Sequence, residues 1–232
     1  MNAHCEVDDD YLAIGTASAA ATGAANVGGR QFAIGVTWWE QEVAAALNSP
    51  IGAGDARHHY DETPGEIESV PLGIFRRSVF EEHGGFDEAL DRNQDYELNW
   101  RIRQGGDSIW FDPRIIVTYR PRRSWRALAR QYFDYGRYKQ RVLRMWPASF
   151  RWHHLAPPVA VLAIVAALVG AVVSTPWCLV VPGIYLLGVA LATILTSRRP
   201  DGRRGSVGAM IAVITMHVAW GTGLLLGAGR RR

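Results

Sequence analysis

The residues best suited to chemistry lie in one short stretch, Arg92–Arg101. It holds a carboxylate, Asp95, where the pattern predicts that an amphipathic helix begins, ten residues after the Gly84-Gly85 pair. A carboxylate fixed on a rigid helix beside a flexible loop can act as a general base toward a substrate hydroxyl. The same carboxylate could instead only cap the helix of residues 96–104, because helix N-termini favour negative charge.

Four neighbours of Asp95 have structural explanations as well as chemical ones. Glu97 and Arg101 are four residues apart, so we expect them to share one helix face and to form an ion pair that steadies the helix. Asn93 and Gln94 could bond substrate hydroxyls or simply close the turn before the helix.

The elements that must position this stretch are predicted to be a mixture of α and β. Helical patterns are found at 8–14, at 38–47, after a capping Ser78, at 95–104 and at 124–146. Strand patterns are found at 70–75, 109–111 and 115–119, the last two separated by Asp112-Pro113. Residues 26–29 predict a turn or a strand end, and residues 50–65 predict a loop long enough to suspect a function.

Three long apolar runs without charged residues fill the C-terminal third, at 155–173, 177–195 and 207–227. Each is close to the roughly 20 residues that cross a bilayer. Three such runs in succession would leave no polar face for water, so we predict transmembrane helices. His217 in the third run is an ionisable group, and we expect it to be neutral and hydrogen-bonded to a neighbouring helix.

The arginines indicate an orientation in the inner or plasma membrane. They gather in 120–151 and in 198–204, which places these segments and the soluble part on the cytoplasmic face of a multi-pass protein. The formal charge of +3 is concentrated there, so the chain lacks the basic surface of a nucleic-acid-binding protein. A third crossing would place Arg230–Arg232 outside against the same rule, and the sequence leaves this open.

The helix at 124–146 carries aromatic residues at helical spacing with arginines on the flanks, which favours a helix in the headgroup plane. An ordinary helix packed on the soluble domain is the alternative. We therefore divide the chain into a soluble domain (1–123), an amphipathic interfacial and juxtamembrane segment (124–153) and a transmembrane region (154–232).

An ordered series of motifs in the soluble part resembles the acceptor-side half of GT-A, family 2 glycosyltransferases. Within that family it is most similar to a bacterial membrane subgroup that resembles the succinoglycan-biosynthesis transferases and shares the segment 117–122. The resemblance extends from Met1 to about Pro158. The motifs are Gly73, Phe75-Arg76-Arg77, Gly84-Gly85-Phe86-Asp87-Glu88, Asn93-Gln94-Asp95-Tyr96-Glu97-Leu98, Arg101 and Gly105-Gly106.

The resemblance implies a membrane-anchored inverting glycosyltransferase that moves a sugar from a nucleotide-sugar donor to a lipid-linked or polysaccharide acceptor. Asp95 would be its base, with Asn93, Gln94 and Trp100 in acceptor binding. Processive relatives place a Gln-x-x-Arg-Trp motif on an interfacial helix, and here Gln131 and Arg137 stand at a longer spacing as donor-diphosphate candidates.

The resemblance also implies a divalent cation, Mg²⁺ or Mn²⁺, held by an acidic motif at a strand end. The corresponding residues here are Asn2 and His4, and the chain has Tyr119 where many relatives carry a late histidine. The nucleotide-binding half that precedes this region in the family is not found before Met1, so we expect a truncated reading frame. The alternative function is a non-catalytic remnant or partner subunit of such a transferase.

Overall fold

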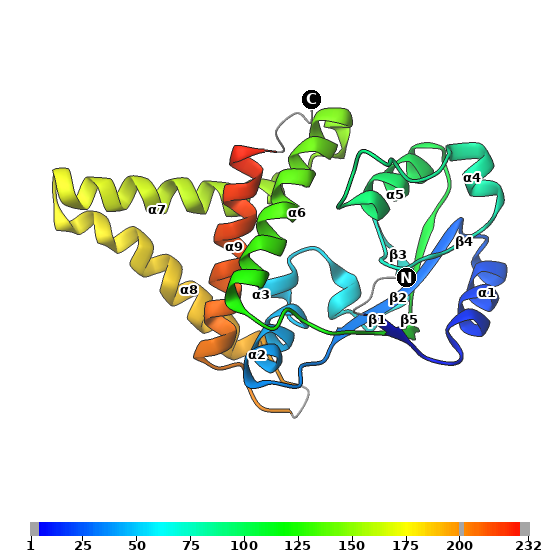
Figure 1. The fold of residues 1–232 in the computed structure, drawn as a ribbon, viewed down its shortest axis with the longest axis horizontal. Helices are drawn as coiled ribbons and strands as arrows, with labels where there is room; N and C mark the ends of the chain where they lie inside the picture. Colours follow the sequence, from blue (N-terminus) through cyan, green and yellow to red (C-terminus); the bar gives the residue numbers. More distant parts are fainter. Residues whose placement is uncertain (1–4, 200–201, 228–232) are drawn as a thin grey trace.

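The computed structural model describes residues 5–199 and 202–227. A mixed α/β body occupies one side of the molecule, and two long apolar helices, α7 (Ala156–Val173) and α8 (Val180–Thr196), project from it as a hairpin (Figure 1). A third apolar helix, α9 (Val207–Leu226), runs beside α6 (Trp125–Met145) between the hairpin and the body (Figure 1). The prediction of mixed α and β structure is confirmed.

A curled sheet forms the centre of the body, around the long strand β5 (Ile109–Tyr119). Strand β2 (Asn26–Ala33) pairs with one edge of β5 in parallel and with β4 (Ile74–Phe75) in antiparallel fashion. Strands β1 (Cys5–Val7) and β3 (Gly65–Glu66) pair antiparallel with the other edge of β5. The strand order is β1-β5-β2-β4, with β3 on β5.

Of the two alternatives for residues 26–29, a turn or a strand end, the structure has the strand: these residues form the buried beginning of β2. Its glycines permit close contact with neighbouring elements. A Cβ on Gly28 would lie 2.6 Å from the Val70 side chain, and one on Gly29 would lie 2.0 Å from the Ile115 carbonyl oxygen. Glycine in a strand can mark such a close approach rather than a turn.

The two strands expected on either side of Asp112-Pro113 are one continuous strand, β5. The pairing of β5 with β2 shifts between Gly28 and Arg30, so Pro113 lies at an irregularity where the ladder does not need its missing N–H. Asp112 is buried and accepts hydrogen bonds from Ser18 and Arg114, which lower the pKa of its carboxyl to about 2.

The helices predicted at 38–47, 95–104 and 124–146 are found close to the expected bounds. The helix predicted at 8–14 lies instead at Tyr11–Thr22, and Ser78 is the first residue of its helix rather than a cap. The predicted loop and one strand also differ. Only Ile74–Phe75 of the predicted strand 70–75 is extended, and the predicted loop 50–65 contains a short helix and a 3-10 turn. The remaining helical elements before α6 are α1 (Tyr11–Thr22), α2 (Trp38–Leu47), α3 (Pro50–Ala53), η1 (Arg57–His59), α4 (Ser78–His83) and α5 (Gln94–Gln104). After α6 come η2 (Pro147–Ser149), η3 (Trp152–Leu155) and, between α7 and α8, η4 (Pro176–Leu179).

Three helical stretches are long and apolar enough to cross a membrane: Trp152–Val173, Pro176–Thr196 and Val207–Leu226. They coincide with the three predicted runs. His217 on α9 contacts Tyr185 on α8 and the Ile51 carbonyl oxygen, at 3.2 and 2.9 Å, so the expected hydrogen bond to a neighbouring helix is confirmed.

Helices α6 and α9 pack closely because glycines lie at their interface. A Cβ on Gly136 would lie 2.1 Å from the Trp220 carbonyl oxygen, and one on Gly223 would lie 2.1 Å from that of Phe133. Ser124 begins α6 by accepting a hydrogen bond from the Ala127 amide. The apolar face of α6 is therefore covered in part by α9.

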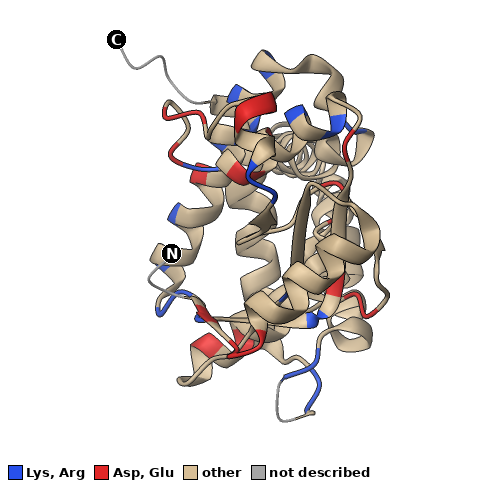
Figure 2. Ribbon diagram, turned by 90° about the vertical axis from the view of Figure 1, so that its right-hand side faces the viewer, with Lys and Arg blue, Asp and Glu red and all other residues tan. Residues whose placement is uncertain are grey.

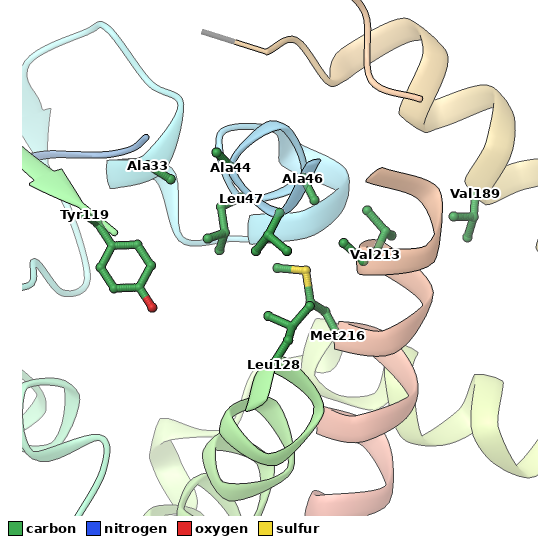
Figure 3. Packing of buried hydrophobic residues seen from close by; sticks show 11 residues of the cluster. Ala33, Ala44, Ala46, Leu47, Tyr119, Leu128, Val189, Val213 and Met216 are labelled. Atoms are coloured by element: carbon green, nitrogen blue, oxygen red, sulfur yellow. The ribbon is translucent and has the colours of Figure 1, made fainter. Parts of the chain in front are cut away.

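The largest hydrophobic cluster contains residues from all three predicted segments, 1–123, 124–153 and 154–232. Leu47 of α2, Leu128 of α6 and Met216 of α9 meet at its centre, and Val189 of α8 closes one side (Figure 3). A buried carboxylate strengthens this connection. Glu42 of α2 accepts hydrogen bonds from the Ser206 hydroxyl (2.7 Å) and the Ala209 amide (3.0 Å) at the start of α9 and pairs with Arg199.

Candidate functional site

The candidate base, Asp95, lies in the first turn of α5. Asn93 precedes the helix in the left-handed conformation (φ 61°), which asparagine tolerates better than most residues. Its side chain donates a hydrogen bond to the Tyr135 carbonyl oxygen of α6 at 3.2 Å rather than capping α5. The turn before Asp95 is therefore attached directly to α6.

The Asp95 carboxylate accepts a hydrogen bond from the Tyr96 amide at 2.9 Å. This contact satisfies a free amide of the first helical turn, as the capping interpretation expects. Burial nevertheless raises the pKa of Asp95 above its usual range, while the backbone amides and the positive charge of Lys139 act in the opposite direction. A carboxyl with a raised pKa is a stronger base once ionised, so the environment suits proton transfer from a hydroxyl.

The predicted pair of Glu97 and Arg101 is confirmed, with Nε and Oε1 2.8 Å apart. Glu97 also accepts a hydrogen bond from the Trp146 indole at 3.0 Å, and Arg101 donates to the Gly85 carbonyl oxygen at 2.7 Å. The pair thus joins α5 to the Gly84-Gly85 turn on one side and to the end of α6 on the other, and it fixes the helix that carries Asp95.

The three acceptor candidates lie in different surroundings. Asn93 is partly buried against α6, and the Gln94 side chain donates to the Leu90 carbonyl oxygen. Trp100 is only 5% exposed and lies under the guanidinium of Arg103, 5.2 Å from its ring centroid. Contact with an acceptor stays a prediction for all three.

The two donor-side candidates on α6 have different neighbours. Gln131 donates to the hydroxyls of Tyr119 (3.1 Å) and Tyr135 (2.7 Å), beside the end of β5. Arg137 donates to the Gly227 carbonyl oxygen at the end of α9, at 3.1 Å. The two side chains are not brought together, and their role toward a diphosphate stays a prediction.

The candidate metal ligands Asn2 and His4 lie outside the described residues. In the part of the chain that the structure describes, Asp55, His153 and His154 place possible ligand atoms within 4.8 Å of one another. His153 Nε2 lies 2.6 Å from an Asp55 carboxylate oxygen, and His154 accepts a hydrogen bond from the Arg151 amide at 3.0 Å through Nδ1. These contacts explain the group as a junction between the 50–65 segment and the start of α7.

One functional candidate, Lys139, was not predicted. It is the single lysine of the chain, is 7% exposed and places its ammonium nitrogen 3.3 Å from the centroid of the Tyr96 ring, next to Asp95. Burial lowers its pKa to about 7. The only sequence signal was a lone lysine among 24 arginines, and its burial depends on contacts that no local pattern reveals.

Comparison with known proteins identifies one relative. No family model and no solved structure matches the chain. The succinoglycan biosynthesis protein ExoA of Rhizobium meliloti (strain 1021) is 31% identical over 233 residues, covering 96% of this chain and 67% of that protein. The alignment covers both the α/β body and the apolar helices. This chain belongs to the ExoA-like family of glycosyltransferases.

Proposed function

We propose that this protein is an inverting, membrane-anchored glycosyltransferase of family 2 with a GT-A type domain, and that Asp95 is its base. In this reaction the acceptor oxygen forms a bond to the anomeric carbon while the bond from that carbon to the donor diphosphate breaks. The acceptor proton passes to Asp95, and the diphosphate leaves with the bonding electrons. The observation that carries the proposal is a partly buried carboxylate with a raised pKa on a fixed helix.

The proposed acceptor is lipid-linked or a growing polysaccharide, met at the cytoplasmic surface of the membrane. Two features support this location. The base-bearing helix α5 is attached to α6, and α6 packs along the apolar α9. Arginines also flank the apolar helices, as Figure 2 shows for the loop between α8 and α9.

We further propose that a divalent cation assists departure of the diphosphate, with Asn2 and His4 as candidate ligands. An amide oxygen and an imidazole suit Mn²⁺ better than Mg²⁺, which prefers carboxylates and water. Transfer should therefore be lost on chelation and restored more fully by Mn²⁺ than by Mg²⁺.

The base assignment is tested with Asp95→Asn in the full chain. Membranes containing the chain are supplied with labelled nucleotide-hexoses, and transfer to lipid and polymer fractions is counted. General-base catalysis contributes about 10²-fold or more, so we expect a loss of at least that size. Glu88→Gln is the matched control, because Glu88 is an exposed carboxylate seven positions before Asp95.

Transfer by Asp95→Asn at the rate of Glu88→Gln would refute the assignment of the base. Failure of the unchanged chain to transfer any of the sugars would instead favour the non-catalytic partner subunit.

A further inference from the structure

One face of α5 carries hydrogen-bond donors that have no acceptor in the part of the chain that the structure describes. Tyr96, Trp100 and Arg103 follow one another at the i, i+4, i+7 spacing that places side chains on one side of a helix. The indole nitrogen of Trp100 and two nitrogens of Arg103, Nε and Nη2, are buried without a hydrogen-bond partner among the described residues. Buried donors normally have an acceptor, so three donor nitrogens without one on a single helix face indicate that a ligand supplies it.

Lys139 of α6 reaches the same face. Its ammonium group rests over the Tyr96 ring, and its side chain forms neither an ion pair nor a hydrogen bond within 5–199 and 202–227. A cation–π contact offsets only part of the cost of burying an ammonium. When protonated, the group is therefore a largely buried cation without a counterion among the described residues.

The nearby carboxylates do not supply that counterion. The negative charges of Asp55 and Glu68 both act to raise the pKa of Lys139. However, Asp55 pairs with His153 at 2.6 Å, and Glu68 pairs with Arg151 at 2.6 Å. Among the described residues, these contacts leave Lys139 and Arg103 without a carboxylate partner of their own.

We propose that Lys139, Arg103 and Trp100 form a binding site for a phosphate or diphosphate group beside Asp95. Phosphate oxygens accept several hydrogen bonds and carry the negative charge that this set of donors lacks. The proposal rests on the proposed function only for the identity of the ligand. The group would be either the diphosphate of the nucleotide-sugar donor or the phosphate of a lipid-linked acceptor.

The position explains how the site would assist the reaction. Tyr96, which supports Lys139, directly follows Asp95, so a phosphate on Lys139 would lie close to the base. Negative charge that develops on a departing diphosphate would then meet a fixed ammonium in a site shielded from water. This role differs from that of Arg137, whose guanidinium is engaged by the end of α9.

The test measures binding of inorganic pyrophosphate to the purified full chain in detergent by isothermal titration calorimetry. We expect Lys139→Gln and Arg103→Gln each to weaken binding by about tenfold or more, since each removes a charge-assisted hydrogen bond. Lys139→Arg should retain most of the affinity. Arg144→Gln, which removes an exposed charge from the same helix, should change it less than twofold.

Pyrophosphate affinity that is equal in Lys139→Gln, Arg103→Gln and Arg144→Gln would overturn the proposal. Thermal unfolding of each variant checks that it is folded, and the two separate variants keep the test valid if one is not. Binding does not require turnover, so a chain that binds pyrophosphate through Lys139 but transfers no sugar would support the site and contradict the proposed function.

Competition then distinguishes the two sources of the phosphate. Uridine diphosphate, a nucleoside diphosphate, and farnesyl phosphate, a lipid phosphate, are each titrated against bound pyrophosphate. If one of them displaces pyrophosphate from the unchanged chain but not from Lys139→Gln, that compound identifies the ligand as the donor diphosphate or the acceptor phosphate. Displacement by neither would overturn the proposal.

Discussion

At Asp95, burial and charge act on the carboxyl pKa in opposite directions. Burial raises it, and the positive charge of Lys139 lowers it. Transfer needs the ionised carboxylate, so activity should fall as the pH drops through this raised pKa. Below pH 7 Lys139 is largely protonated, because its own pKa is about 7. Its charge is therefore present over the range in which the acidic limb of the pH profile is measured.

Replacing Lys139 with methionine should move the acidic limb of transfer activity to higher pH, by about one unit for the loss of a nearby opposite charge. Methionine keeps the apolar length of the side chain, so packing over Tyr96 is largely preserved. Rates are measured from pH 5 to 8 at saturating donor. An acidic limb that coincides with that of Arg144→Gln would contradict the influence of Lys139 on Asp95.

Asp95, Glu97 and Arg101 could be predicted from sequence because their relation is local, set by helical spacing. Lys139 could not, since its burial arises only where α6 meets α5 and the segment around Asp55 and Glu68. The burial of Trp100 likewise depends on the fold around it, and its contact with an acceptor stays a prediction. Residues whose role depends on packing between distant segments leave little trace in a single sequence.

Among the elements, helices were predicted well and strands poorly. Helices α2 and α6 have side-chain N-caps, and α2, α5 and α6 have a clear period, which are properties of neighbouring residues. Strand β2 begins Asn-Val-Gly-Gly, and its glycines serve close contacts with Val70 and Ile115 that only the assembled sheet contains. The continuity of β5 through Pro113 likewise depends on the shifted pairing with its neighbour.

The contact between α6 and α9 should be sensitive to a single methyl group. In Gly223→Ala the new Cβ would lie 2.1 Å from the Phe133 carbonyl oxygen and 3.1 Å from the Arg137 amide nitrogen. Both are backbone atoms, so the helices must separate, at a cost of about 1–3 kcal/mol. We expect a lower midpoint of thermal unfolding in detergent.

Gly188→Ala is the control, because a Cβ there meets nothing within 4 Å on α8. It should leave stability unchanged or raise it by up to about 1 kcal/mol through helix propensity. Equal unfolding midpoints for the two variants would show that α6 and α9 are not packed as closely as described.

At the scale of the whole molecule, the three apolar helices are not equivalent. The most apolar windows of α7 and α8 are 11% buried, whereas that of α9 is 39% buried. Helix α9 runs beside α6, and α7 leaves the pair at a steep angle (Figure 1). The start of α9 is held by the buried Glu42 of α2. If α9 crossed the bilayer along the membrane normal, Glu42 and the arginines of α6 would lie in or against the hydrocarbon, at a cost of several kcal/mol for each charge.

We therefore expect α7 and α8 to cross the bilayer as a hairpin and α9 to lie on the cytoplasmic surface with α6. This arrangement also agrees with the charge rule that three crossings would break. The apolar face that α6 and α9 share supports it. A groove of about 680 Å³ lies there, lined by Trp125, Ala129, Phe133, Ile211, Ile214 and Val218 among others, and is suited to contact with acyl chains.

Single cysteines in a chain lacking Cys5 and Cys178 test this topology in intact spheroplasts with a membrane-impermeant maleimide. Ser174→Cys, exposed near the turn between α7 and α8, should be labelled from outside, and Thr63→Cys, exposed in the α/β body, should react only after lysis.

The deciding position is Leu226→Cys, 71% exposed at the end of α9. If the chain crosses the membrane twice, this cysteine should react with the maleimide only after lysis, because the whole of α9 then lies on the cytoplasmic side. Labelling of Leu226→Cys from outside would show that α9 spans the membrane. Helix α6 would then also lie along the membrane normal beside α9, and its arginine side chains would have to extend toward the headgroups to keep their charges out of the hydrocarbon.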